Sequence, residues 1–126
     1  MKKEIKIIAD GYVTVNVKIT GVVGAGYYLD LFEKKSNNVI FYYSGTNEYS
    51  HDDSRVLPNS AKMNVGRVLM LNTSVVSIDD EADIEKKFKI SLQIFQNGKL
   101  VDEAVIADTL KKEHKNFLTI VKLVSS

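Results

Sequence analysis

The chain has 126 residues, of which 44% are hydrophobic and 26% are charged. Its 17 basic and 16 acidic residues nearly cancel, so no strong net charge favours nucleic acid or an anionic membrane surface as a partner. It contains no cysteine, which excludes disulfides, thiolate nucleophiles and cysteine-ligated metal centres. We therefore expect a single globular domain over residues 1–126, with no nucleic-acid partner.

No stretch of the chain is long and apolar enough to predict a membrane span. The longest apolar runs, at residues 39–43 and 68–71, are far shorter than the ~20 residues that cross a bilayer. The charged N-terminus also lacks the apolar segment of a secretory signal, which is roughly 7–15 residues long. We expect a protein that is either cytoplasmic or exported with its leader already removed.

The first predicted elements are two strands. Residues 12–20 alternate between apolar and polar side chains, which is typical of a strand with one buried face. The pair Asp10 and Gly11 suits a tight turn, because both residue types tolerate the positive φ angles of such a turn. The sequence therefore predicts an N-terminal hairpin that joins residues 4–9 to residues 12–20.

Three glycines follow, at positions 21, 24 and 26, and they do not match a phosphate-binding motif. The residues after them alternate like a strand, so no helix N-terminus is available to hold an anion. A bend or bulge between strands is the favoured interpretation. Further strands are predicted at residues 27–33, 39–43 and 65–71.

Two pairs of neighbouring tyrosines lie in these predicted strands, Tyr27 with Tyr28 and Tyr42 with Tyr43. Successive side chains of a strand point to opposite faces, so one tyrosine of each pair must face outward. A stacking surface for single-stranded nucleic acid would also need a basic groove, and acidic residues offset the lysines nearby. We expect tyrosines at a sheet surface with their hydroxyls in water.

Residues 47–58 hold most of the candidate site residues. A histidine beside carboxylates can bind a divalent metal or act as a general base, so the candidate metal ligands here are His51, Asp52 and Asp53. Neighbours in an extended segment point apart, however, whereas a metal needs three or four converging ligands. A polar stretch that ends in proline is typical of an exposed loop. In such a loop the candidate contacts to a partner are Tyr49, His51 and Arg55.

The acidic run at residues 78–87 supplies further candidate metal ligands, Asp79, Glu81 and Asp83. An EF-hand loop that starts at Asp79 would need glycine at its sixth position and glutamate at its twelfth, where this chain has Ile84 and Ile90. A solvated helical turn is the favoured interpretation, and a calcium site of another kind is the alternative.

The C-terminal part predicts a second hairpin. Residues 88–94 alternate between apolar and polar side chains, and Asn97-Gly98 is the pair best suited to a two-residue type I′ turn. Residues 87–96 should therefore pair with residues 99–107. Residues 108–116 are predicted to form a helical turn with Asp108 as N-cap. The strand that begins at Phe117 is apolar on both faces, which indicates a central position in a sheet.

Many short strands and little helix predict an all-β fold, an antiparallel sandwich of about seven to nine strands. Its general shape would be that of immunoglobulin-like, transthyretin-like or C2-like sandwiches. The alternative is a small closed β-barrel.

The favoured function is a non-catalytic binding or assembly module for protein–protein interaction. The partner would be another protein, or a second copy paired through an edge strand. No G-x-S-x-G motif occurs and only two histidines are present, so a serine enzyme is disfavoured, and no cofactor is expected. One alternative is a small-ligand carrier with a barrel cavity, and a weaker one is a metal-dependent hydrolase that uses the residues around His51.

Overall fold

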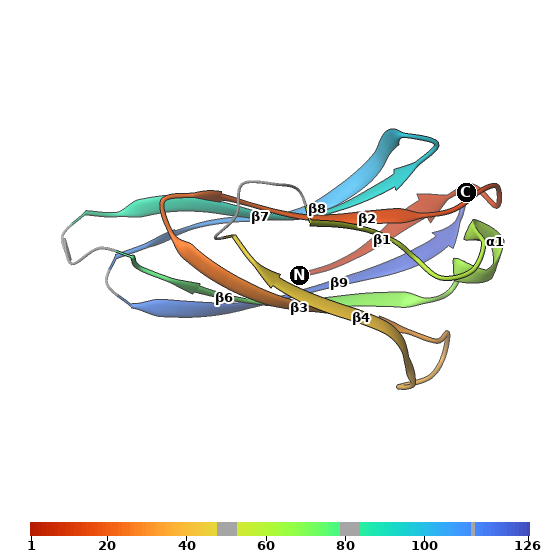
Figure 1. The fold of residues 1–126 in the computed structure, drawn as a ribbon, viewed down its shortest axis with the longest axis horizontal. Helices are drawn as coiled ribbons and strands as arrows, with labels where there is room; N and C mark the ends of the chain where they lie inside the picture. Colours follow the sequence, from red (N-terminus) through yellow and green to blue (C-terminus); the bar gives the residue numbers. More distant parts are fainter. Residues whose placement is uncertain (48–52, 79–83, 112) are drawn as a thin grey trace.

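The computed structural model describes residues 1–47, 53–78, 84–111 and 113–126. Within these residues nine strands form two sheets that face each other, and the helix is only four residues long (Figure 1). In chain order the elements are β1 (Lys2–Ile7), β2 (Thr14–Gly21), β3 (Gly24–Phe32), β4 (Val39–Thr46), β5 (Asp53–Val56), α1 (Ala61–Asn64), β6 (Val68–Val76), β7 (Lys86–Gln96), β8 (Lys99–Leu110) and β9 (His114–Ser125).

The two sheets have five and four strands. The order is β1-β9-β6-β3-β4 in the first and β5-β2-β7-β8 in the second, and the sheets are not closed into a barrel. The predicted sandwich is confirmed, and the alternative of a closed barrel is wrong. All strand pairs are antiparallel except β1 with β9, which is parallel.

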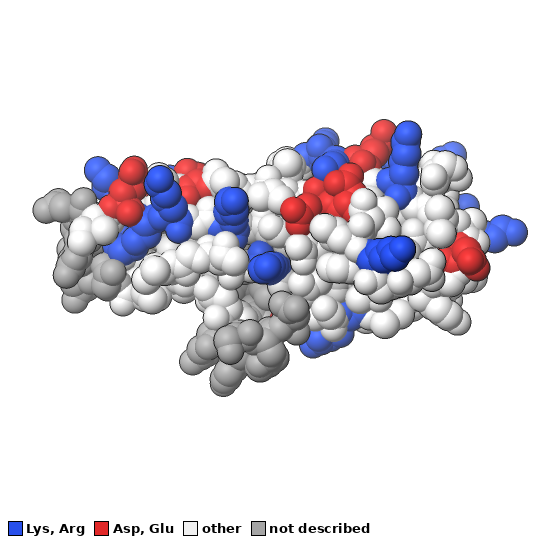
Figure 2. Space-filling view, turned by 90° about the horizontal axis from the view of Figure 1, so that it is seen from above, with Lys and Arg blue, Asp and Glu red and all other residues white. Residues whose placement is uncertain are grey.

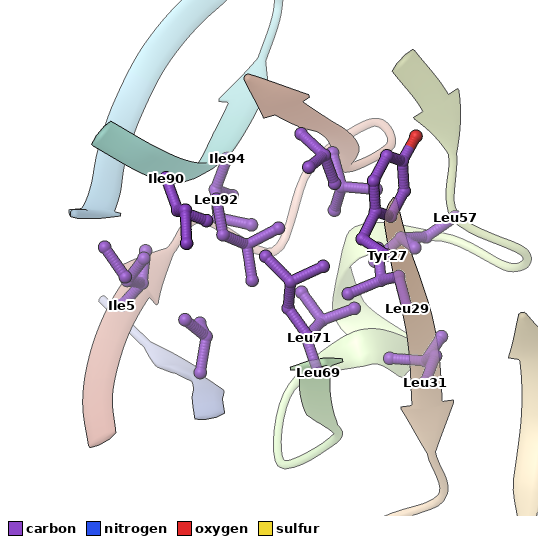
Figure 3. Packing of buried hydrophobic residues seen from close by; sticks show 14 of the residues in the cluster. Ile5, Tyr27, Leu29, Leu31, Leu57, Leu69, Leu71, Ile90, Leu92 and Ile94 are labelled. Carbon is purple, nitrogen blue, oxygen red and sulfur yellow. The ribbon is translucent and has the colours of Figure 1, made fainter. Parts of the chain in front are cut away.

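The core fills the space between the sheets (Figure 3). Every second residue of the central strands points inward, as period-two alternation requires. In β6, for example, Leu69, Leu71 and Val75 are fully buried, whereas Asn72 and Ser74 are exposed on the opposite face. The side chains labelled in Figure 3 come from both sheets and point toward one another, which shows that one apolar cluster joins the two layers.

The predicted N-terminal hairpin is wrong, because β1 and β2 belong to different sheets. Gly11 does have a positive φ of 67°, but the corner it makes carries the chain from one sheet to the other. Gln96 holds this crossing in place: its side-chain amide accepts a hydrogen bond from Ile8 N at 3.0 Å and donates to Ile8 O at 2.9 Å. A glycine corner suits both connections, so the dipeptide alone could not distinguish them.

The second predicted hairpin is confirmed. Asn97 and Gly98 both have positive φ, 53° and 72°, and Gln96 pairs with Lys99 across the turn. Strand β8 continues to Leu110, which is fully buried, and β9 begins at His114. The helical turn predicted for residues 108–116 is therefore wrong for the described residues, because a buried leucine and pairing with β7 keep residues 108–110 extended. Strand β9 lies between β1 and β6, and its predicted central position is confirmed.

One buried arginine ties α1 to the five-stranded sheet. The guanidinium of Arg67, which is 4% exposed, donates from Nε and Nη2 to the two carboxylate oxygens of Glu33, both at 3.2 Å. Its Nη1 donates to the side-chain oxygens of Asn59 and Asn64, at 2.9 and 3.1 Å. Because a guanidinium group can donate to both oxygens of one carboxylate, this bidentate contact fixes the end of β3 against the start of β6.

This ion pair predicts a specific sensitivity to acid. The hydrogen bonds from Arg67 lower the pKa of Glu33 below its ordinary value of 4.5. The unfolded chain therefore binds a proton at Glu33 more readily than the folded chain does, so this contribution to stability is complete above pH 4.5 and is lost as the pH falls through the lower folded-state pKa. We expect the melting temperature of Glu33→Gln to fall less steeply below pH 4.5 than that of the wild type.

The comparison of the two proteins isolates Glu33 from other acids. The pKa of Asp102 is also lowered, by the backbone N–H of Glu103 and by Lys3, so both proteins should lose some stability in acid. Equal slopes of melting temperature against pH in the two proteins would contradict the role assigned to the Glu33–Arg67 pair.

Candidate functional site

A trough hollows the outer face of the five-stranded sheet. It crosses β4, β3, β6 and β9 and has a volume of about 720 Å³. Strand register builds its two rows: Tyr28 lies between Ser44 and Asn72, and Gly26 lies between Thr46 and Ser74. The lining residues are Gly26, Tyr27, Tyr28, Ser44, Gly45, Thr46, Asn72, Thr73, Ser74, Asn116 and Phe117.

Two glycines shape this trough in different ways. A Cβ at Gly26 would meet only the carbonyl oxygen of Gly45, at 3.9 Å, so the space above Gly26 is open. A Cβ at Gly45 would instead meet Tyr27 Oη at 2.6 Å, together with the carboxylate of Asp53. The missing side chain at Gly26 therefore opens the trough to solvent. The missing side chain at Gly45 instead leaves space for the side chains of Tyr27 and Asp53, which pack against it.

The lining groups can form hydrogen bonds with a ligand. Tyr28 is 68% exposed, and the side chains of Tyr28, Ser44 and Asn72 make no hydrogen bond to any other residue that the structure describes. Ser74 Oγ donates to Asn116 Oδ1 at 2.7 Å, which leaves the amide N–H groups of Asn116 pointing elsewhere. Aromatic, hydroxyl and amide groups thus meet on one face.

The trough also differs from the opposite face of the molecule in charge. Its lining residues include no aspartate, glutamate, lysine, arginine or histidine. Figure 2 shows the outer side of the four-stranded sheet, where basic and acidic side chains lie intermixed along one margin. A hollow of about 510 Å³ on that side is lined by Lys87, Lys89 and Asp108 among others. Of these two hollows, only the trough on the five-stranded sheet has a lining without charged residues.

Comparisons with protein-family models, curated proteins and solved structures found no match. The arrangement of the described residues is therefore the basis for any statement on function. No helix among them is long and apolar enough to span a membrane.

The sequence-predicted residue Arg55 lies on β5, where its guanidinium packs over the ring of Tyr43 at 4.8 Å from the centroid. Arg55 also pairs with Asp53 at 3.0 Å, and Tyr43 Oη donates to the backbone oxygen of Asp53 at 3.2 Å. Burial raises the pKa of Tyr43 to about 12, so its hydroxyl stays protonated and keeps donating. In this structure Arg55 and Asp53 hold β5 against β4.

The remaining sequence-predicted candidates, Tyr49, His51, Asp52, Asp79, Glu81 and Asp83, lie outside the described residues. The described residues beside these two segments each lie near the start of β3: the side chain of Asn47 accepts from Ala25 N and donates to Val23 O, and Ile78 lies next to Gly24. Among the described residues, no three carboxylate or histidine side chains could share a metal ion. A metal site in these two segments stays a prediction.

The four sheet edges differ in charge, a feature that the sequence analysis did not use. Strands β1, β5 and β8 each carry charged residues, whereas β4 (VIFYYSGT) has none over eight residues. In the described chain β4 pairs with β3 on one side only. Val39 and Tyr42 are 41% and 75% exposed along it, so β4 is an uncharged edge with accessible apolar surface.

Proposed function

We propose that this protein is a non-catalytic assembly module, in which β4 pairs antiparallel with β4 of a second copy of the chain. The observation that supports the proposal is the absence of charge on this edge strand. Proteins commonly protect exposed edge strands with charged residues, because the unpaired backbone N–H and C=O groups of an edge can form hydrogen bonds with a strand of another chain. Strand β4 lacks that protection and has the composition of a segment that pairs readily, with aromatic and β-branched residues and no proline.

A second copy is the partner that this edge fits best. Antiparallel pairing of identical strands creates a two-fold symmetric contact, in which each residue meets its own counterpart or a near neighbour. Such a contact is disfavoured when the strand carries charge, because like charges then lie opposite one another. An uncharged strand meets no such repulsion, and the pairing would join two five-stranded sheets into one continuous sheet.

The opposite side of the sandwich is less suited to pairing. There β1 and β8 lie at neighbouring edges of the two sheets, and Lys3 links them. Lys3 Nζ donates to Asp102 Oδ1 at 3.0 Å and to Glu103 O at 2.7 Å. A strand added at this side would have to displace these contacts and would meet charged side chains.

A single substitution to lysine on β4 tests whether the protein self-associates through this strand. We expect the wild-type protein to form a concentration-dependent dimer, and Tyr42→Lys to weaken that dimer by at least about tenfold, since two ammonium groups would face each other across the pairing. Tyr42 is 75% exposed, so the change should leave the monomer folded. Sedimentation velocity or light scattering over a range of concentrations gives the dissociation constant.

The matched control is Leu100→Lys, which places a lysine at a 47% exposed position on the other sheet's edge strand, β8. This variant should dimerise like the wild type. A wild-type protein that stays monomeric at every concentration would overturn the proposal, and so would equal weakening by the two substitutions.

The other hypotheses have less support. A carrier would need an apolar cavity between the sheets, and core side chains such as Leu29, Leu71 and Leu92 occupy that space (Figure 3). The carrier also presupposed a closed barrel, which the fold is not. Of the residues that the hydrolase would use, His51 and Asp52 lie outside the described chain, and the carboxylate of Asp53 pairs with Arg55 at 3.0 Å.

A further inference from the structure

Gly26 occupies a position where the fold does not require glycine. Its backbone is extended in the middle of the sheet, without a positive φ, and a Cβ would meet only a carbonyl oxygen at 3.9 Å. A glycine inside a strand lowers stability, because it loses more freedom on folding and contributes no side chain to the sheet. Such a glycine often marks a place where a ligand approaches the backbone closely.

The groups around Gly26 define the ligand that would fit there. The side chains of Ser44 and Asn72 make no hydrogen bond to another described residue, so each can both donate and accept. Ser74 and Asn116 bond to each other, which leaves the lone pairs of the Ser74 hydroxyl and the N–H groups of the Asn116 amide. No carboxylate, ammonium, guanidinium or imidazole group is among the described residues that line the trough. An anionic ligand would therefore lose hydration without gaining a cationic partner.

We infer that the trough binds a neutral carbohydrate chain. Sugar hydroxyls both donate and accept hydrogen bonds, which matches the lining amides and hydroxyls. The exposed ring of Tyr28 offers an apolar face on which the C–H groups of a sugar ring can pack. A lipid would leave these polar groups unpaired, and a phosphorylated ligand would lack a counter-charge.

The size of the trough agrees with a short oligosaccharide. It crosses four strands, and strands about 4.8 Å apart place the outer two about 14 Å from each other. Its volume of about 720 Å³ is within the range of small-molecule sites, about 300–1,000 Å³. These dimensions fit a trisaccharide that lies across the strands in contact with Tyr28 and the floor at Gly26.

The test is a titration of isotope-labelled full-length protein with neutral trisaccharides: cellotriose, maltotriose, mannotriose and N,N′,N″-triacetylchitotriose. Changes in amide chemical shift should cluster at trough residues for at least one of them. Gly26→Val fills the floor, and Tyr28→Ala and Asn72→Ala remove contacts, so each should weaken that binding by at least about tenfold. The control Tyr12→Ala removes a 62% exposed tyrosine outside the trough and should bind like the wild type.

The outcomes separate this inference from the assembly proposal. Monomeric Tyr42→Lys should still bind the sugar, because Tyr42 does not line the trough. Failure of all four trisaccharides to shift trough amides would overturn the inference, as would unchanged affinity of Gly26→Val or binding of trigalacturonic acid alone. None of these three results would alter the oligomeric state on which the assembly proposal depends.

Discussion

Leu71→Ala is expected to lower the free energy of unfolding by about 2–5 kcal/mol, the range for a buried leucine whose removal leaves a cavity. Leu71 is fully buried in the central strand β6, between Leu29 of β3 and Thr119 of β9. Figure 3 shows its side chain among the apolar residues between the sheets. Because a domain of this kind is stable by only about 5–15 kcal/mol, the loss is a large fraction of the total.

The matched control is the next residue along the strand. Asn72→Ala removes an exposed side chain from the outer face and should change stability by less than about 0.5 kcal/mol. Urea unfolding followed by circular dichroism gives both values from the transition midpoints, provided that the slope is unchanged. Similar losses in the two variants would mean that the inward and outward faces of β6 are assigned wrongly.

The contrast between these neighbours explains why the fold class was predictable. Inward and outward positions alternate by the geometry of a strand, so a half-buried strand such as residues 12–20 shows its structure locally. The Asn97-Gly98 turn was equally local, since both residues adopt the positive φ that a type I′ turn requires. Strands and a tight turn are properties of a few successive residues.

Strand partners were not predictable in this way. Strand β1 pairs in parallel with β9, and the N-terminal nitrogen of Met1 donates to Leu118 O, 117 residues away. Nothing in residues 2–7 indicates that partner, because backbone hydrogen bonds carry no sequence information. The same reason explains the error at Gly11, where a local turn signal was compatible with both a hairpin and a crossing between sheets.

The trough was hidden from the sequence for a related reason. Gly26, Ser74 and Asn116 lie far apart in the chain and become neighbours only through the register of β3, β6 and β9. The sequence predicted that one tyrosine of each pair faces outward, and the structure shows that the exposed members are Tyr28 and Tyr42. Gly26 was the one local signal that pointed to this face, but its spacing with Gly21 and Gly24 predicted a bend or bulge between strands.

Gly45→Ala is expected to lower the free energy of unfolding by about 1–3 kcal/mol, as overpacking does in a well-filled site. The added methyl group would lie 2.6 Å from Tyr27 Oη and 2.9 Å from Tyr27 Cζ. Tyr27 is 3% exposed, and its ring packs edge-on against Tyr43 at 6.1 Å between centroids, so it has little room to move.

Gly26→Ala is the control, because Gly26 lies on the paired strand and faces open space. Both substitutions restrict the unfolded chain equally, so the difference between them reports contacts in the folded state. Gly26→Ala should raise the free energy of unfolding by about 0.5–1 kcal/mol. Urea unfolding midpoints measure both changes, and a loss of stability at both positions would contradict the open floor of the trough.

A second substitution identifies the contact responsible. Tyr27 Oη is buried and has no hydrogen-bond partner in the part of the chain that the structure describes, so Tyr27→Phe should not destabilise the protein. Removing this oxygen also removes the closest Tyr27 atom from the methyl group of Ala at position 45. The double variant Gly45→Ala with Tyr27→Phe should therefore regain part of the lost stability, a positive coupling in a double-mutant cycle. Strictly additive effects would show that the Asp53 carboxylate, and not Tyr27, is what position 45 must accommodate.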